Sequence, residues 1–115
     1  GHLTGRLLLG REGYPLNMKR IIEACAAHQV AIELNCNPHR LDLDWRWLKA
    51  CKTAGVKIVL SPDAHSVFGF EDLQYGLNLA KKGFLTANDI LNTESADFII
   101  HYFSHKTKQN ISKGI

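Results

Sequence analysis

Two short apolar runs separated by helical patterns constrain the fold of this chain more than any other feature. The runs cover residues 30–34 and 56–60, and each has the length of a buried strand. Apolar residues recur at helical spacing before, between and after them, over about residues 16–28, 42–54 and 71–82. Strands that alternate with helices are typical of βαβ units, in which the strands run parallel. The sequence therefore predicts an α/β fold with parallel strands and flanking helices.

Residues that start or stop helices support these boundaries. Pro15 lies near the predicted start of the first helix, and Gly55 and Gly83 follow the predicted ends of the second and third. Thr86 and Asp89 have the spacing of a capping box, which predicts a short helix there. A last helix is expected over about residues 95–106, and residues 62–70 are predicted to form a long loop.

The composition is that of an ordinary globular domain. The chain has 115 residues, of which 45% are hydrophobic and 22% charged, so it holds one domain at most. The net charge of +3 is too small to predict nucleic-acid binding and does not oppose it. No apolar run is long enough to span a membrane, and no signal peptide opens the chain. We therefore expect a cytoplasmic protein that does not enter a membrane.

The cysteines agree with a reducing compartment. Cys25, Cys36 and Cys51 are odd in number and form no C-x-x-C motif, so neither a disulfide framework nor a zinc ribbon is predicted. Cys36 follows the first apolar run, so we expect it near the end of a strand and open to oxidation.

The two predicted strands are too few for a complete sheet of this class. Parallel strands need neighbours on both edges and helices on both faces. The first residues, Gly1 to Arg6, have the character of a loop that leaves a strand whose own residues are absent. We therefore expect either that the chain is part of a larger domain or that self-association supplies the missing edge.

Asp63 and His65 directly follow the second apolar run, within the sequence Pro62-Asp63-Ala64-His65-Ser66. In extended backbone, residues i and i+2 point to the same side, so these two side chains are expected to reach one small target together. A carboxylate and an imidazole suit Mn, Fe or Zn, and α/β folds hold ligands at the carboxyl ends of their strands. The D-x-H pattern alone also occurs by chance, so its position is what favours a metal site.

The loops around this motif are similar to the C-terminal half of the PHP (polymerase and histidinol phosphatase) domain of bacterial family X DNA polymerases. Residues 2–6, 10–16, 32–47 and 62–66 carry the similarity. The most specific stretch is N-P-x-R-L-D-L-D-W-R-W at residues 37–47. The resemblance covers about residues 1–95 and leaves residues 96–115 as a C-terminal helix and tail.

This resemblance implies the C-terminal βα units of a distorted (β/α)7 barrel with a metal cluster at the carboxyl ends of its strands. Such domains hydrolyse phosphoesters, and in family X polymerases they are associated with a manganese-dependent 3′ to 5′ exonuclease. His2 matches the histidine of the family's His-Pro-Thr-Gly-Arg loop, with Leu3 in place of the proline. Asp63 and His65 match its last metal-binding motif, which makes them the implied catalytic residues. The implied metal ligands are thus His2, Asp63 and His65, with manganese favoured and zinc or iron as alternatives.

The family's early H-x-H motif, its middle histidine and its bridging glutamate have no counterpart in this sequence. The metal cluster is therefore expected to be incomplete in this chain, and the chain alone is expected to be inactive. The implied partners are DNA, reached through a longer protein, an N-terminal polymerase domain and the other half of the PHP domain.

Four further residues are candidates for substrate binding. Arg6 has the geometry to clamp a phosphate, although a structural salt bridge explains it equally well. Arg40 carries the same two interpretations, because the carboxylates of residues 42 and 44 are close to it in sequence. Glu33 and Asn35 alternate with apolar residues, so both are expected to face the mouth of the fold.

Three functions remain open at this point. The first is a phosphoesterase module that acts on DNA 3′ ends within a family X polymerase. The second is a non-catalytic structural module of such a polymerase. The third is a small-molecule phosphatase of the histidinol phosphate type, which lacks the D-L-D-W-R-W stretch.

Overall fold

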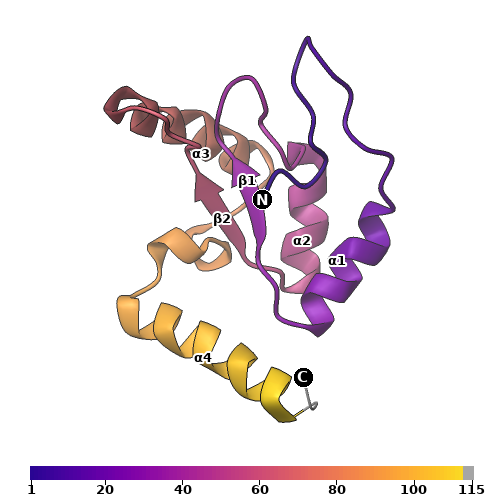
Figure 1. Cartoon of the computed structure of the whole chain (residues 1–115), viewed down its shortest axis with the longest axis vertical. Coiled ribbons are helices and arrows are strands. Elements are labelled where there is room, and N and C mark those ends of the chain that lie inside the picture. Colours follow the sequence, from indigo (N-terminus) through magenta and orange to yellow (C-terminus); the bar gives the residue numbers. More distant parts are fainter. Residues whose placement is uncertain (113–115) are drawn as a thin grey trace.

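The computed structural model describes the backbone of residues 1–112 and side chains as far as residue 104. Two strands, β1 (Ile32–Asn35) and β2 (Ile58–Ser61), pair in parallel from Ile32↔Ile58 to Asn35↔Ser61. The helices of the described residues are α1 (Met18–Ala27), α2 (Leu48–Ala54), α3 (Leu73–Lys82) and α4 (Ala96–Ser112) (Figure 1). The predicted α/β fold with parallel strands is confirmed. The partial barrel stays a prediction, because two paired strands are compatible with a barrel segment and with an open sheet.

The helix boundaries follow from their caps. Helix α1 begins at Met18 because the Asn17 side chain accepts a hydrogen bond from the Arg20 backbone N–H at 3.2 Å. Helix α2 ends at Gly55, whose φ of 77° is the left-handed conformation that glycine adopts without strain. The predicted capping box is present, with the Thr86 backbone N–H donating to Asp89 Oδ2 at 2.7 Å.

Some predicted boundaries were wrong. The loop expected over residues 62–70 contains the 3₁₀ turn η2 (Val67–Asp72), so α3 begins at Leu73. Strand β1 begins at residue 32, because the chain leaves α1 through Gln29 in a left-handed conformation with a φ of 53°. Helix α4 continues beyond the predicted end at residue 106.

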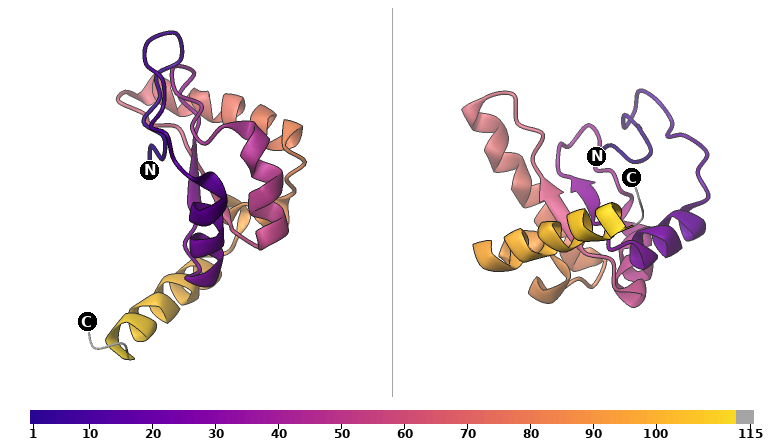
Figure 2. Two further views of the ribbon diagram at one scale, coloured as in Figure 1. Left: turned by 90° about the vertical axis from the view of Figure 1, so that its right-hand side faces the viewer. Right: turned by 60° about the horizontal axis from the view of Figure 1, so that its bottom comes forward.

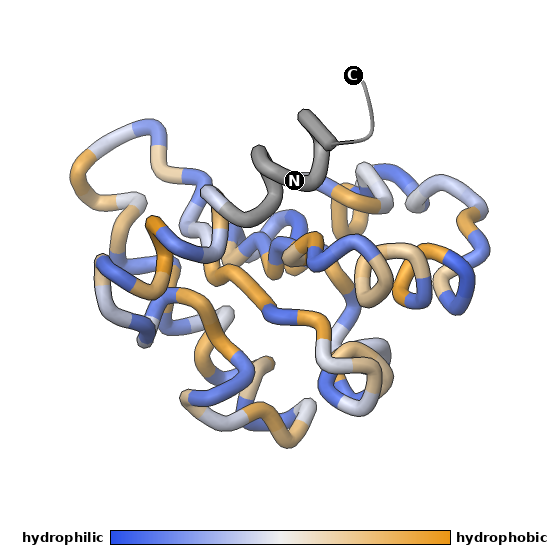
Figure 3. The backbone as a smooth tube through the Cα atoms, turned by 90° about the horizontal axis from the view of Figure 1, so that it is seen from below, coloured by the Kyte–Doolittle hydropathy of each residue, from blue (hydrophilic) through white to orange (hydrophobic). Residues whose placement is uncertain are grey.

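The core lies between one face of the sheet and the first three helices. Side chains from both strands and from α1, α2 and α3 form a single buried cluster, and hydrophobic and hydrophilic residues alternate along the helices (Figure 3). The central members of the cluster are Ile22, Ile32, Leu34, Leu48, Cys51, Ile58, Leu60 and Ala80.

Helix α3 crosses the end of β1 closely enough to require a glycine. A Cβ atom at Gly76 would lie 2.1 Å from Cys36 Sγ. Cys36 is fully buried under this crossing, so the prediction that it is open to oxidation was wrong. Burial raises the pKa of its thiol from 9.0 to about 11, which keeps the sulfur protonated and unreactive.

Both edges of the two-stranded sheet are covered by nearby chain. On the outer edge of β1, the Asn35 N–H donates to the Asp42 carbonyl at 2.5 Å and the Leu43 N–H donates to the Glu33 carbonyl at 3.3 Å. On the outer edge of β2, Ile58 forms a parallel bridge with Ile90. These contacts satisfy backbone groups that an isolated pair of strands would leave open.

Helix α4 lies apart from this core, beyond the amino ends of the strands (Figure 2). The Tyr102 hydroxyl donates to the Gln29 carbonyl at 2.6 Å, and Lys57 Nζ lies 5.6 Å from the centre of the Phe98 ring. No helix in the described part of the chain is long and apolar enough to cross a membrane.

Candidate functional site

The candidate site lies at the carboxyl ends of the two strands. Asn35 is the last residue of β1, Asp63 follows the end of β2, and the N-terminal loop brings His2 beside them (Figure 1). The Asn35 side-chain amide donates to Nδ1 of His2 at 3.1 Å and to Oδ2 of Asp63 at 3.3 Å. His2 Nε2 lies 4.0 Å from the same carboxylate oxygen. One fully buried amide thus holds both side chains together.

The residues around this pair also come from the predicted set. Glu33 accepts a hydrogen bond from the His2 backbone N–H at 2.7 Å, which fixes the N-terminal loop against β1. Arg40 Nε lies 3.6 Å from Asp63 Oδ2. The predicted site residues His2, Glu33, Asn35, Arg40 and Asp63 are therefore brought together.

His65 stands at the margin of the site. Its side chain is 85% exposed, and Nδ1 lies 2.7 Å from the Asp63 backbone carbonyl oxygen and 3.9 Å from Asp63 Oδ1. Asp63 has a φ of 56°, so the extended backbone assumed for the D-x-H pair is not present. His2 is also left-handed, with a φ of 50°. Such strained residues other than glycine are concentrated at functional sites.

The predicted metal ligands do not form a complete metal site within the described residues. No three His, Cys, Asp or Glu side chains in this part of the chain are placed so that they could hold a metal ion. Asp63 Oδ2 instead faces the amide of Asn35 and the guanidinium of Arg40. The described residues thus do not by themselves fit the metal cluster, and we derive no catalytic step through a bound metal.

Asp42 is a functional residue that sequence reasoning did not identify. Its side chain is fully buried, and Oδ2 accepts hydrogen bonds from the Thr4 and Gly5 backbone N–H groups at 3.0 and 3.1 Å. Asp42 therefore holds the loop that carries His2. The sequence signals for Asp42 were its place in the family-specific stretch at residues 37–47 and its charge between two leucines, and neither indicated that it binds the N-terminal loop.

Arg6 is engaged within the structure. Its Nη1 lies 3.0 Å from Asp44 Oδ2, and its Nε donates to the Arg40 carbonyl at 2.9 Å. Hydrogen bonds from the side chain of Arg46 and from Arg6 hold the pKa of Asp44 well below its usual range. Of the two predicted roles of Arg6, phosphate clamp or structural salt bridge, the structure shows the salt bridge. This contact joins the N-terminal loop to the segment after β1.

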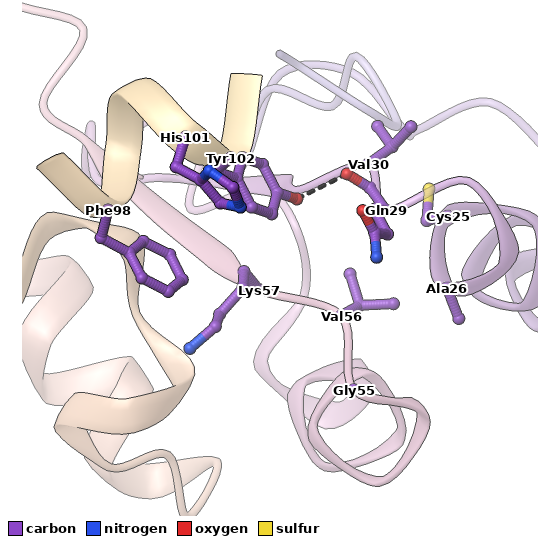
Figure 4. Close-up of a pocket in the computed structure, with 10 residues that line it drawn as sticks. All are labelled: Cys25, Ala26, Gln29, Val30, Gly55, Val56, Lys57, Phe98, His101 and Tyr102. Atoms are coloured by element: carbon purple, nitrogen blue, oxygen red, sulfur yellow. Dashed lines mark hydrogen bonds between the residues drawn. The ribbon is translucent and has the colours of Figure 1, made fainter. Parts of the chain in front are cut away.

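A separate cavity of about 360 Å³ lies at the opposite end of the sheet, between α1, α4 and the start of β2 (Figure 4). Gln29, Lys57 and Tyr102 are among the residues that line it. It contains none of the predicted site residues.

Comparisons with known proteins bear on the family of the chain. No protein-family model matches the chain. Over 94 residues, which is 82% of its length, the chain is 37% identical to "DNA polymerase/3'-5' exonuclease PolX" of Bacillus subtilis (strain 168). It is 32% identical over 90 residues, 72% of its length, to a "Probable phosphatase" of Shewanella loihica (strain ATCC BAA-1088 / PV-4).

The chain spans only part of either relative, namely 16% of the polymerase and 36% of the phosphatase. The predicted resemblance to the PHP domain of family X DNA polymerases is confirmed by these matches. The chain therefore belongs to the PHP-domain family, as a segment of the PHP domain of a family X DNA polymerase.

Proposed function

We propose that this chain forms one side of a phosphoesterase site that hydrolyses DNA from the 3′ end, within a family X polymerase. The observation that carries the proposal is the convergence of His2, Asn35 and Asp63 from three separate segments at the carboxyl ends of the strands. The printed name of the Bacillus relative, a polymerase and 3'-5' exonuclease, supports DNA as the substrate.

The chain's own residues would bind and orient the substrate phosphate. The Arg40 guanidinium faces the site and can donate hydrogen bonds to a phosphate oxygen in place of the carboxylate of Asp63. The Asn35 Oδ1 accepts from the Asn37 backbone N–H, so its NH₂ group faces His2 and can only donate. Nδ1 of His2 is therefore the acceptor, and a neutral His2 carries its proton on Nε2. That proton is directed toward Asp63 Oδ2, at 4.0 Å from Nε2, which is longer than a hydrogen bond.

The proposal includes a divalent metal ion, with manganese favoured and zinc or iron as alternatives. Such an ion would supply an activated water and charge stabilisation at phosphorus. His2, Asp63 and His65 are its proposed ligands in this chain. For His2 to bind the ion, the Asn35 NH₂ group would have to release Nδ1, because neutral His2 has only one ring nitrogen with a free lone pair. Asp63 lies 4.0 Å from His2 Nε2 and 3.9 Å from His65 Nδ1, but these three side chains do not form a site that could hold a metal ion, so the remaining ligands would come from outside the described residues. For this reason we propose that the chain alone does not catalyse hydrolysis.

The test compares nucleotide release from 3′-labelled single-stranded DNA in the presence of Mn²⁺. In a longer protein that carries this segment, Asp63→Ala and His65→Ala should abolish release and leave nucleotide insertion intact. Asp97→Asn, on the exposed first turn of α4, is the matched control and should change neither activity. Full exonuclease activity in both site variants, or rapid turnover by the 115-residue chain alone, would contradict the proposal.

The phosphatase relative supports a second candidate, a small-molecule phosphatase. The two candidates differ in substrate, because a phosphatase acts on a terminal phosphate and an exonuclease on a diester. Release of inorganic phosphate from p-nitrophenyl phosphate, without nucleotide release from DNA, would favour the phosphatase. Absence of both activities in the longer protein would favour the non-catalytic structural module.

A further inference from the structure

The 3₁₀ turn η2 presents large apolar side chains to solvent directly beside the candidate site. Val67, Phe68 and Phe70 are 80%, 81% and 61% exposed, and we call these three residues the η2 patch. The patch begins two residues after His65. Two neighbouring phenylalanine rings exposed to this degree are unfavourable unless a ligand or partner covers them.

The η2 patch is held rigidly against the D-x-H motif. A Cβ atom at Gly69 would lie 2.9 Å from Cα of Ala64, so the turn packs on the residue between Asp63 and His65 as closely as backbone allows. The Gly69 N–H also donates to the Ser66 carbonyl at 3.1 Å. The η2 patch and the site therefore lie at a fixed distance from each other. A subsite that binds one part of a substrate needs such a fixed distance from the reacting group.

The site side of the η2 patch holds a cation, Arg40, together with the carboxylates of Asp63 and Glu33, whereas two carboxylates follow the patch on its other side. Arg40 lies in the site itself, beside Asp63. Glu71 and Asp72 follow the patch on its other side, and Glu71 is exposed. A phosphate is attracted toward Arg40 and repelled from the acidic end of η2. A nucleotide would therefore direct its phosphate into the site and its neutral, planar base onto the phenylalanine rings.

We propose that the η2 patch is a stacking platform for the base of the 3′-terminal nucleotide of single-stranded DNA. The inference rests on the proposed function, because it assigns a second subsite to the same substrate. Aromatic side chains bind bases of any sequence through their ring faces, so the platform should favour single strands without selecting a base.

The first measurement is the affinity of the 115-residue chain for a short fluorescent oligothymidine, by fluorescence anisotropy at low salt. Phe68→Ala and Phe68→Leu should each weaken binding by about 5- to 100-fold, because both remove the ring. Phe68→Trp should retain binding or strengthen it, and its indole emission should be quenched by the stacked base. Phe84→Ala is the matched control, since Phe84 is 71% exposed at the other end of α3, and it should bind like the original chain.

The second measurement repeats the series with an oligonucleotide whose 3′-terminal nucleotide lacks its base. If the platform binds that base, the original chain should bind this DNA weakly. The Phe68 variants should then bind it with the same affinity as the original chain. Equal binding by Phe68→Ala and the original chain, or no DNA binding by any form, would overturn the inference. A change of oligomeric state in Phe68→Ala, measured by sedimentation without a change in DNA affinity, would identify the patch as a protein interface and also overturn it.

These outcomes are separate from those that test the proposed function. If Asp63→Ala abolished exonuclease activity in the longer protein but Phe68→Ala did not change DNA binding, the proposed function would be supported and the stacking platform would be rejected. If DNA binding depended on Phe68 but the longer protein had no exonuclease activity, the stacking platform would be supported and the proposed function would be rejected.

Discussion

At the scale of single residues, Asp42 determines the position of His2 more than any predicted ligand does. Its Oδ2 accepts two backbone hydrogen bonds from the N-terminal loop, while Oδ1 is buried and has no hydrogen-bond partner among the described residues. A buried carboxylate oxygen without a partner is costly, so the two bonds to Oδ2 must offset that cost for the loop to stay in place.

Replacing Asp42 with Asn should therefore loosen the loop. The amide oxygen can accept the same two backbone hydrogen bonds, and the NH₂ group takes the place of Oδ1, which already lacks a partner among the described residues. The two bonds to the neutral amide are weaker than those to the carboxylate, which costs about 1–3 kcal/mol in all. We expect the free energy of unfolding in urea to fall by about that amount. The NMR signal of the His2 ring should also shift, whereas that of His101 in α4 should not. Unchanged stability together with an unchanged His2 signal would show that Asp42 does not hold the loop.

At the scale of elements, Asn92 takes the place of a third strand. Its side-chain Oδ1 accepts from the Leu60 N–H at 2.8 Å, and its Nδ2 donates to the Leu60 carbonyl at 2.9 Å. One amide side chain thus makes the two hydrogen bonds that a neighbouring strand would make to β2. The return segment at Asp42 and Leu43 does the same for β1.

Asn92→Asp tests this role with nearly the same shape. The carboxylate keeps the acceptor for the Leu60 N–H but places a second oxygen against the Leu60 carbonyl. We expect a loss of about 1–3 kcal/mol in the free energy of unfolding and faster hydrogen exchange at Leu60. Asn88→Asp, at an exposed position in the 3₁₀ turn η3 (Ala87–Asp89), is the control and should change stability by less than about 0.5 kcal/mol. Equal effects of the two substitutions would refute the role of Asn92.

The elements show what the sequence could and could not predict. Both strands, the helices and the Thr86 capping box were predictable because periodicity and caps are local. The edge contacts of Asn92 and the return segment at Asp42 were not, since they join residues far apart in sequence. Likewise, the family resemblance selected His2 and Asp63, but the left-handed backbone at Asp63 and the hydrogen bonds of Asn35 to both residues needed the folded structure.

At the scale of the whole molecule, α4 is an appendage to a core made by α1 to α3 and the sheet. A cavity of about 360 Å³ separates it from α1 and β2, and Phe98, Ile100 and Phe103 are 38%, 64% and 52% exposed (Figure 4). These exposed apolar side chains show that α4 buries only part of its apolar surface against the rest of the described chain. The division of the chain into residues 1–95 and 96–115 stays a prediction, and residues 113–115 lie outside the described backbone.

A chain that ends at residue 95 should therefore still fold. It loses the hydrogen bond from Tyr102 to the Gln29 carbonyl and the contact of Lys57 with the Phe98 ring, while the pairing of Lys57 with Glu94 at 3.2 Å is retained. Because each lost contact is worth about 0.5–1.5 kcal/mol, we expect the free energy of unfolding to fall by about 1–3 kcal/mol with the transition still cooperative. Hydrogen exchange should remain slow in β1 and β2 and speed up near Gln29 and Val30, where α4 is removed. If the shortened chain instead lost its cooperative transition, α4 would have to be counted as part of the core, and the division of the chain at residue 95 would be wrong.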